Sequence, residues 1–154
     1  MAALASTGVH DDLAIQSLRA GNMLRVRAHG GSMLPFLRDG DVLVVRPIGA
    51  RGVRIGDVLC YEPPSGGLCL HRVVARGERG FVTRGDALRY LEDVPETAVL
   101  GVVTARDRRG RTVALDTLAA HRRARLIALG APALARCLPL ARGLWRMGRG
   151  LRRG

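Results

Sequence analysis

The chain has 154 residues, a formal net charge of +12 and 47% apolar residues, which excludes a disordered polypeptide and suits a single folded domain. Aromatic residues make up only 3%, which argues against a protein that stacks the bases of single-stranded nucleic acid. The sequence contains no lysine, so every basic side chain is an arginine or a histidine. The charge is uneven, because residues 121–154 hold nine arginines and no acidic residue.

The N-terminal part is predicted to form a short helix followed by two strands. Acidic residues at the start of the segment 11–20 favour a helix, which Gly21 would end. Alternating apolar and polar residues predict a half-buried strand over 23–30, and an apolar run predicts a second strand over 42–47. Ser32 falls in the glycine-rich break between these strands.

A unit made of a turn and a strand occurs twice. The segments "RDGDVLVVRP" and "RIGDVLCYEP" share a Gly-Asp pair, a four-residue strand and a proline. This pattern predicts that Asp41 and Asp57 are turn residues that lead into strands, not catalytic acids. Further strands are predicted in two hairpins, which turn at "GERG" and "DRRG", over 67–76 and 81–84 and over 99–106 and 111–117.

Short strands at regular spacing predict a mainly β fold with a folded-over or barrel-like antiparallel sheet. The expected organisation is an N-terminal helical segment (1–22), a β domain (23–116) and an Arg-rich amphipathic helical tail (117–154). Pro132 and Pro139 would kink or split the helix of the tail.

The three cysteines, Cys60, Cys69 and Cys137, lack the spacing of a metal-binding motif. Cys60 and Cys69 lie in apolar, strand-like runs, so we expect buried free thiols; a disulfide between them is the alternative. We expect no metal and no cofactor.

Ser32 is the candidate nucleophile of the chain. It follows two glycines in "HGGSMLPFLRDGD", and glycines let the backbone turn tightly and approach another segment closely. A nucleophilic hydroxyl needs a neighbouring base. Because lysine is absent, the base must come from the histidines, and His71 within "LCLHRVVAR" is the best placed. An ordinary loop serine and a structural histidine with a satisfied hydrogen bond are the alternatives.

A third group should orient the imidazole of His71. If the chain turns at "GERG", the strand "FVTR" runs back along the strand of His71 and returns Asp86 to its neighbourhood. Asp93 is a second candidate, with a solvated loop acid as its alternative reading.

Five segments in order resemble the motifs of the type I signal peptidases, serine endopeptidases related to the self-cleaving LexA-like repressors. They are "GGSMLPFLRDGDVLVVRP", "IGDVLCY", "HRVV", "FVTRGDA" and "VLGVV", within residues 23–105. The resemblance implies the β catalytic domain of that family and cleavage of a leader or signal peptide through an acyl-enzyme. Most bacterial members have a lysine base, whereas "HRVV" is similar to the histidine subtype of archaea, the endoplasmic reticulum and sporulating bacteria.

The same resemblance implies roles for single residues. It makes Ser32 the nucleophile, His71 the base and Asp86 the acid of the Gly-Asp motif, with Asp93 as a possible second acid.

The resemblance also implies how the substrate is held. Backbone N–H groups of Gly31 and Ser32 would bind the oxyanion. The substrate would bind as an extended strand, and Met33 and Leu34 would shape its site. Gly30 stands where many members carry a hydroxyl that helps to bind the oxyanion, so only backbone donors are expected at that position.

The basic segment 121–154 is expected to bind an anionic membrane surface, with Trp145 at the headgroups; an amphipathic helix packed on its own domain is the alternative. The N-terminus has neither the basic start nor the apolar run of a signal peptide or membrane anchor. We therefore expect a peripheral membrane location, with a cytoplasmic one as the alternative. A nucleic-acid partner is not expected, and the oligomeric state is open.

Two other functions stay open. One is a LexA-like self-processing domain, which the absence of lysine disfavours. The other is a non-catalytic β domain whose basic tail binds anionic lipid or nucleic acid.

Overall fold

A computed structural model describes residues 9–50, 52–117, 119–120, 122–123 and 126–127 of the chain. Within these residues, one helix precedes a sheet of eight strands: α1 (Val9–Arg19), β1 (Leu24–Arg27), β2 (Val42–Arg46), β3 (Val58–Tyr61), β4 (Cys69–Arg76), β5 (Gly80–Arg84), β6 (Glu92–Pro95), β7 (Val99–Arg108) and β8 (Arg111–Ala114). A single 3-10 turn, η1 (Glu96–Ala98), joins β6 to β7. All strand pairs are antiparallel, which confirms the mainly β prediction.

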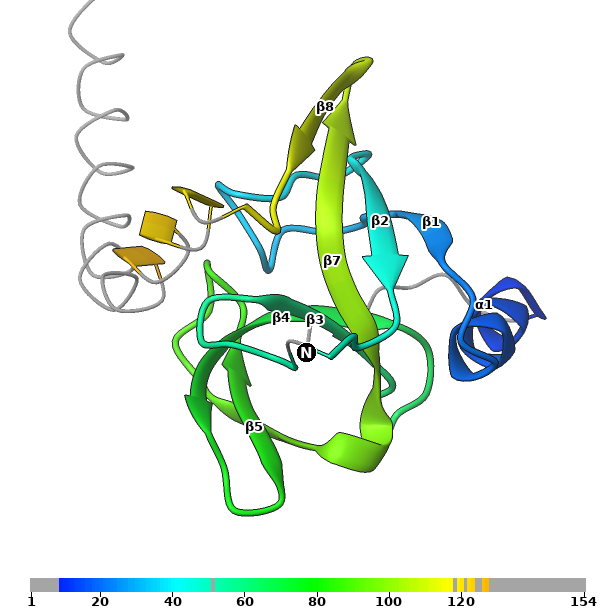
Figure 1. Cartoon of the computed structure of the whole chain (residues 1–154), viewed down its shortest axis with the longest axis vertical. Coiled ribbons are helices and arrows are strands. Elements are labelled where there is room, and N and C mark those ends of the chain that lie inside the picture. Colours follow the sequence, from blue (N-terminus) through cyan, green and yellow to red (C-terminus); the bar gives the residue numbers. More distant parts are fainter. Residues whose placement is uncertain (1–8, 51, 118, 121, 124–125, 128–154) are drawn as a thin grey trace, which may run out of the picture.

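The long strand β7 organises the sheet, and it runs through the middle of the molecule in Figure 1. The strand order is β1-β2-β7-β3-β4-β5-β6, and β8 also pairs with β7. One edge of β7 pairs with β2, and its other edge pairs first with β3 and then with β8. The sheet is not closed, so the barrel-like form of the predicted sheet is wrong.

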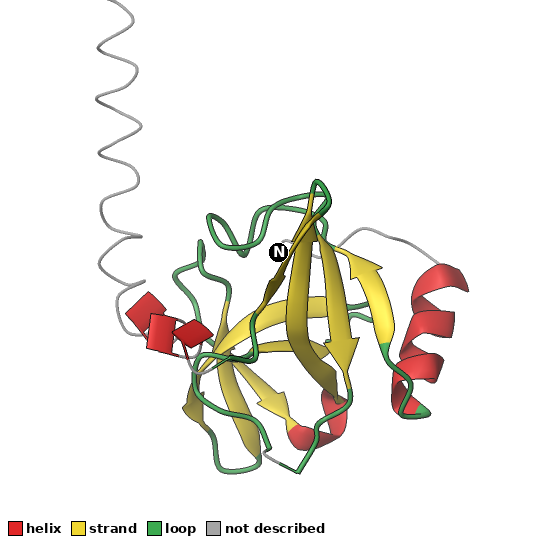
Figure 2. Cartoon of the chain, turned by 45° about the horizontal axis from the view of Figure 1, so that its top comes forward, coloured by secondary structure: helices red, strands yellow, loops and turns green. Residues whose placement is uncertain are grey.

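Side chains of the strands alternate between two apolar clusters, as the period of a β-strand requires. The first cluster joins α1, the loop after β1 and the sheet: Ile15, Leu18, Met33, Leu37, Leu43, Val45, Cys60 and Leu70 are among its buried members. The second cluster lies on the other face: Leu59, Tyr61, Val73, Phe81, Val94 and Val102. Figure 2 shows α1 packed beside the yellow strands at one side of the sheet. Two residues that follow one another on a strand therefore enter different clusters.

The repeated turn has the same geometry in both copies. In the first copy, Asp41 Oδ2 accepts the backbone N–H of Arg38 at 2.9 Å, and in the second Asp57 Oδ2 accepts that of Arg54 at 2.9 Å. Each aspartate N–H donates back to the same residue's carbonyl oxygen, at 3.1 Å in both turns. The predicted turn role of both aspartates is confirmed.

The predicted helix and most predicted strands match observed elements within a few residues. Strand β6 was not predicted, because acidic residues and Pro95 are typical of a loop. β6 is the end strand of the sheet, where a proline costs no ladder hydrogen bond on its free side.

Cys60 and Cys69 are free thiols, as predicted; Cys60 is buried and Cys69 is partly exposed. Cys137 lies outside the described residues. The described residues 119–120, 122–123 and 126–127 are helical, and the rest of the predicted tail, including its two prolines and Trp145, lies outside the described part of the chain.

Candidate active site

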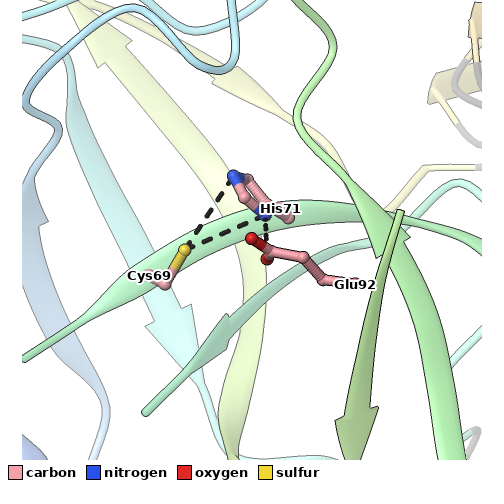
Figure 3. A group of neighbouring side chains, drawn as sticks. All are labelled: Cys69, His71 and Glu92. Carbon is pink, nitrogen blue, oxygen red and sulfur yellow. Dashed lines mark hydrogen bonds and ion pairs between the residues drawn. The ribbon is translucent and has the colours of Figure 1, made fainter. Parts of the chain in front are cut away.

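His71 lies on β4 between β3 and β5, and its side chain is 3% exposed. Its Nδ1 atom is 2.8 Å from Oε2 of Glu92 and 3.0 Å from the hydroxyl oxygen of Tyr61. The Tyr61 hydroxyl also donates a hydrogen bond to the same Glu92 oxygen. Figure 3 shows the Glu92 carboxylate directed at the imidazole. A buried histidine with two polar neighbours on one nitrogen has a fixed ring orientation.

These contacts indicate which tautomer the imidazole adopts. Burial, together with the nearby Cys69 thiol and Glu92 carboxylate, raises the pKa of Tyr61 far above its ordinary value, so the phenol is a hydrogen-bond donor. An ionised carboxylate accepts hydrogen bonds only, so the contact with Glu92 favours the tautomer that has its proton on Nδ1. In that tautomer Nε2 is the acceptor nitrogen of the ring.

Cys69 lies two residues before His71 on β4, so both side chains point to the same face. Its sulfur atom is 3.9 Å from Nδ1 and 3.9 Å from Nε2 of the imidazole. Burial is the main cause that raises the pKa of the Cys69 thiol, which keeps the group uncharged. Ligand atoms of Cys69, His71 and Glu92 all lie within 4.8 Å of one another.

Ser32 lies in the loop between β1 and β2 and is half-buried. The base of the loop is closed by two backbone hydrogen bonds, from Ala28 N–H to Asp41 at 2.8 Å and from Gly40 N–H to Ala28 at 2.9 Å. The Ser32 carbonyl oxygen accepts the backbone N–H of Ala87 at 2.9 Å. The loop is thus tied to the segment that follows β5.

Gly85 allows this close approach. A Cβ atom on Gly85 would lie 2.7 Å from the carbonyl oxygen of Ser32, so any other residue would push the loop away. The β4–β5 register pairs Arg72 with Arg84, and its extension by one residue places His71 opposite Gly85. Opposite residues of an antiparallel pair share a face. The Ser32 backbone therefore occupies the space that a side chain at position 85 would fill.

The serine and histidine side chains themselves are not joined. Within the described part of the chain, the Ser32 hydroxyl makes no hydrogen bond, and the polar neighbours of His71 are Tyr61, Glu92 and Cys69.

Asp86 is bound by Arg72 and does not contact the imidazole. Arg72 Nε donates to Oδ1 and Nη2 donates to Oδ2, both at 2.7 Å, and the two side chains are 1% and 3% exposed. Arg72 also donates to the Gly56 carbonyl at 2.8 Å and lies over the Phe36 ring at 4.5 Å. The acid beside His71 is Glu92, which the sequence analysis did not single out. Glu92 lies on β6, and because this strand was not predicted, no sequence pattern placed Glu92 beside His71.

Asp93 is exposed on β6 and pairs in register with Val82. As the neighbour of Glu92 on a strand, it points to the opposite face. It lines a shallow cavity of about 340 Å³ between the β4–β5 turn and β6.

The residues around Ser32 differ in how they could serve a substrate. Met33 is buried in the first cluster, whereas the Leu34 side chain is 38% exposed and can contact a ligand. Gly30 has a φ of +80°, a conformation that glycine favours, and donates its N–H to Asp39 at 3.1 Å. Among the described residues, the N–H groups of Gly31 and Ser32 donate no hydrogen bond.

Comparison of the chain with protein-family models, with curated protein sequences and with solved structures finds no match. No helix within the described residues combines the length and apolar character needed to cross a membrane.

Proposed function

We propose that the chain is a serine endopeptidase of the signal peptidase type that cleaves a leader or signal peptide. Ser32 is the nucleophile, His71 the general base and Glu92 the acid that orients it. One observation supports the proposal: Nδ1 of the buried His71 contacts the Glu92 carboxylate, while the backbone of Ser32 packs against Gly85 directly after β5. In the proposed mechanism, Nε2 of His71 accepts the proton of the Ser32 hydroxyl.

The reaction divides the work among these groups. The Ser32 hydroxyl turns toward Nε2 of His71, which takes its proton as Oγ attacks the scissile carbonyl carbon. The N–H groups of Gly31 and Ser32 stabilise the resulting oxyanion. The imidazolium returns its proton to the departing amine, and the acyl-enzyme remains. Water, deprotonated by His71, then attacks the ester and regenerates Ser32.

Glu92 serves both halves of the cycle. Its carboxylate accepts the Nδ1 proton and stabilises the positive charge that the imidazole gains during attack. Tyr61 donates to the same carboxylate and holds it in place. The hydroxyl that many relatives place at position 30 is absent, so backbone donors alone act on the oxyanion.

Arg72 and Asp86 position the nucleophile loop instead of taking part in proton transfer. Arg72 stacks on Phe36, four residues after Ser32, and binds Asp86, which follows Gly85. One buried guanidinium thus connects the loop that carries Ser32 to the segment that accepts it. This role explains why a Gly-Asp pair stands at this point.

The direct test is cleavage of a leader-bearing peptide by wild type, Ser32→Ala and His71→Ala. We expect a loss of at least about 10³-fold in kcat/KM for each variant. Ser65→Ala and His29→Ala are matched controls, because both residues are exposed and lie outside the proposed triad. A histidine base further predicts a rate that falls in acid, because a protonated imidazole cannot accept the proton of the nucleophile. Full activity in either triad variant would overturn the proposal.

The membrane location is proposed on charge alone. Nine arginines without an acidic residue in 121–154 favour an anionic lipid surface. Flotation of the full chain and of a chain ending at residue 120 with anionic vesicles tests it. Equal flotation of both would contradict the role of the segment.

A further inference from the structure

Three side chains of different chemical type converge on the second face of the sheet. Cys69 and His71 come from β4, and Glu92 reaches them from β6, across β5. Their sulfur, nitrogen and oxygen atoms all lie within 4.8 Å of one another. Figure 3 shows the three side chains pointing toward one another. Thiolate, imidazole and carboxylate are the three ligand types that Zn²⁺ takes in proteins.

The distances are close to those of a metal site. With metal–ligand distances of about 2.0 to 2.3 Å, tetrahedral ligand atoms lie roughly 3.3 to 3.5 Å apart. The sulfur of Cys69 is 3.9 Å from Nδ1 of His71, and Nδ1 is 2.8 Å from Glu92. The three ligand atoms lie within 4.8 Å of one another, so Cys69 and Glu92 would have to change rotamer to place all three around one ion.

The site is also accessible. His71 is 3% exposed and rigidly held, whereas the Glu92 side chain is 35% exposed and Cys69 is partly exposed. Two of the three ligands are therefore partly exposed, so an ion can reach them from solvent. The combination of one buried and two accessible ligands is suited to reversible binding.

We propose that Cys69, His71 and Glu92 bind a single Zn²⁺ ion, which withdraws His71 and Glu92 from peptide cleavage. The binding is independent of the proposed function; only its inhibitory effect rests on it. The ion would bind Nδ1 of His71 in place of its proton, which would move to Nε2, and the Cys69 thiol would release its proton to solvent. Glu92 would then contact the ion instead of the imidazole. Zinc would thus act as an inhibitor, not as a catalyst.

Binding is tested with Zn²⁺ alone, in competition with a chromophoric chelator, on the full chain. We expect one ion per chain at this site, and Co²⁺ in its place should give a thiolate-to-cobalt charge-transfer band. Cys69→Ala should abolish the band and weaken binding by more than the roughly 10–100-fold that loss of an outer-shell group costs. Cys60→Ala is the matched control, since it removes a thiol that lies outside the cluster.

The outcomes separate the two proposals. Unchanged affinity and an unchanged cobalt band in Cys69→Ala would overturn the metal site, whatever the peptidase assay shows. If zinc binds as expected, peptide cleavage should fall with the same apparent constant, and Cys69→Ala should resist inhibition. Zinc binding in a chain that cleaves no leader peptide would support the metal site and overturn the proposed function alone. Ser32→Ala should bind zinc like wild type, because Ser32 is not a ligand.

Discussion

His71 and Arg72, which are neighbours on β4, each contact one carboxylate, but the two contacts differ in geometry and in exposure to solvent. Arg72 and Asp86 form a bidentate pair in which the side chains are 1% and 3% exposed. His71 and Glu92 form a single contact in which the histidine is equally buried but Glu92 is 35% exposed. Because successive strand residues point to opposite faces, each basic group needs an acid of its own.

The two pairs therefore differ in role: Arg72 and Asp86 form a structural pair, whereas His71 and Glu92 are the pair proposed to take part in proton transfer. Both Arg72 and Asp86 stay charged and bind each other with parallel hydrogen bonds, so their pair can only hold segments together. The Glu92 carboxylate beside His71 reaches solvent. In the proposed mechanism, proton transfer takes place on the His71 face of β4, while Arg72 on the other face contacts the Ser32 loop through Phe36.

The largest effect on stability should come from breaking the buried ion pair of Arg72 and Asp86. Asp86→Asn keeps the shape of the side chain but leaves the Arg72 charge buried without its counter-charge. We expect the free energy of unfolding to fall by about 3–5 kcal/mol, measured by urea denaturation. Asp93→Asn is the control, because Asp93 is exposed on β6, and its change should stay within about 0.5 kcal/mol. Equal effects of the two substitutions would contradict the structural role of Asp86.

The sequence could predict most of the sheet but not which acid faces which base. The alternation of "LCLHRVVAR" and the turn at "GERG" correctly brought Asp86 back beside β4. Successive residues of a strand point to opposite faces, so the orientation that places Arg72 beside Asp86 turns His71 away from Asp86. The prediction that Asp86 orients His71 did not take this alternation into account. The arginine next to the histidine was the available signal for the partner of Asp86, since an arginine buried on a strand needs a carboxylate beside its charge.

Glu92 could not be found in the same way, because its contact depends on a strand with weak local propensity. β6 is held by pairing with β5 and not by its own composition. The cluster of Cys69, His71 and Glu92 was missed for the same reason: its members come from strands separated by β5. Motif spacing detects ligands that are close in sequence, whereas strand pairing in the sheet brings Glu92 to Cys69 and His71.

Glu92→Gln should affect the chemistry of the second pair with little effect on folding. The glutamine amide can donate to Nδ1 and favour the tautomer with a proton on Nε2, which cannot accept from Ser32. We expect kcat/KM to fall by about 100-fold, equal to roughly 2.7 kcal/mol of transition-state stabilisation.

Glu96→Gln is the matched control, because Glu96 forms an exposed pair with Arg76. It should keep full activity. If Glu92→Gln lowered the free energy of unfolding as much as Asp86→Asn and left kcat/KM unchanged, the division between the two faces of β4 would be wrong.

The smallest effect is expected at a third pair, which has the bidentate form of Arg72–Asp86 but more solvent. Arg108 donates to both oxygens of Asp41 at 2.7 Å, and the Arg108 side chain is 26% exposed. The hydrogen bond from Arg108 is the main cause that lowers the pKa of Asp41 below its ordinary value. Stability from the pair is therefore complete above the unfolded-state pKa of about 3.9 and is lost as pH falls through the folded-state pKa.

Asp41→Asn should consequently cost about 1–3 kcal/mol at pH 7, less than Asp86→Asn, since solvent reaches Arg108. Thermal unfolding of the variant and of wild type from pH 7 to pH 2.5 should show a difference that shrinks below about pH 4. Asp116→Asn, at an exposed position after β8, serves as the control and should match wild type throughout. A stability difference that stays constant across the whole range would mean that Asp41 acts through its turn hydrogen bond and not through its charge.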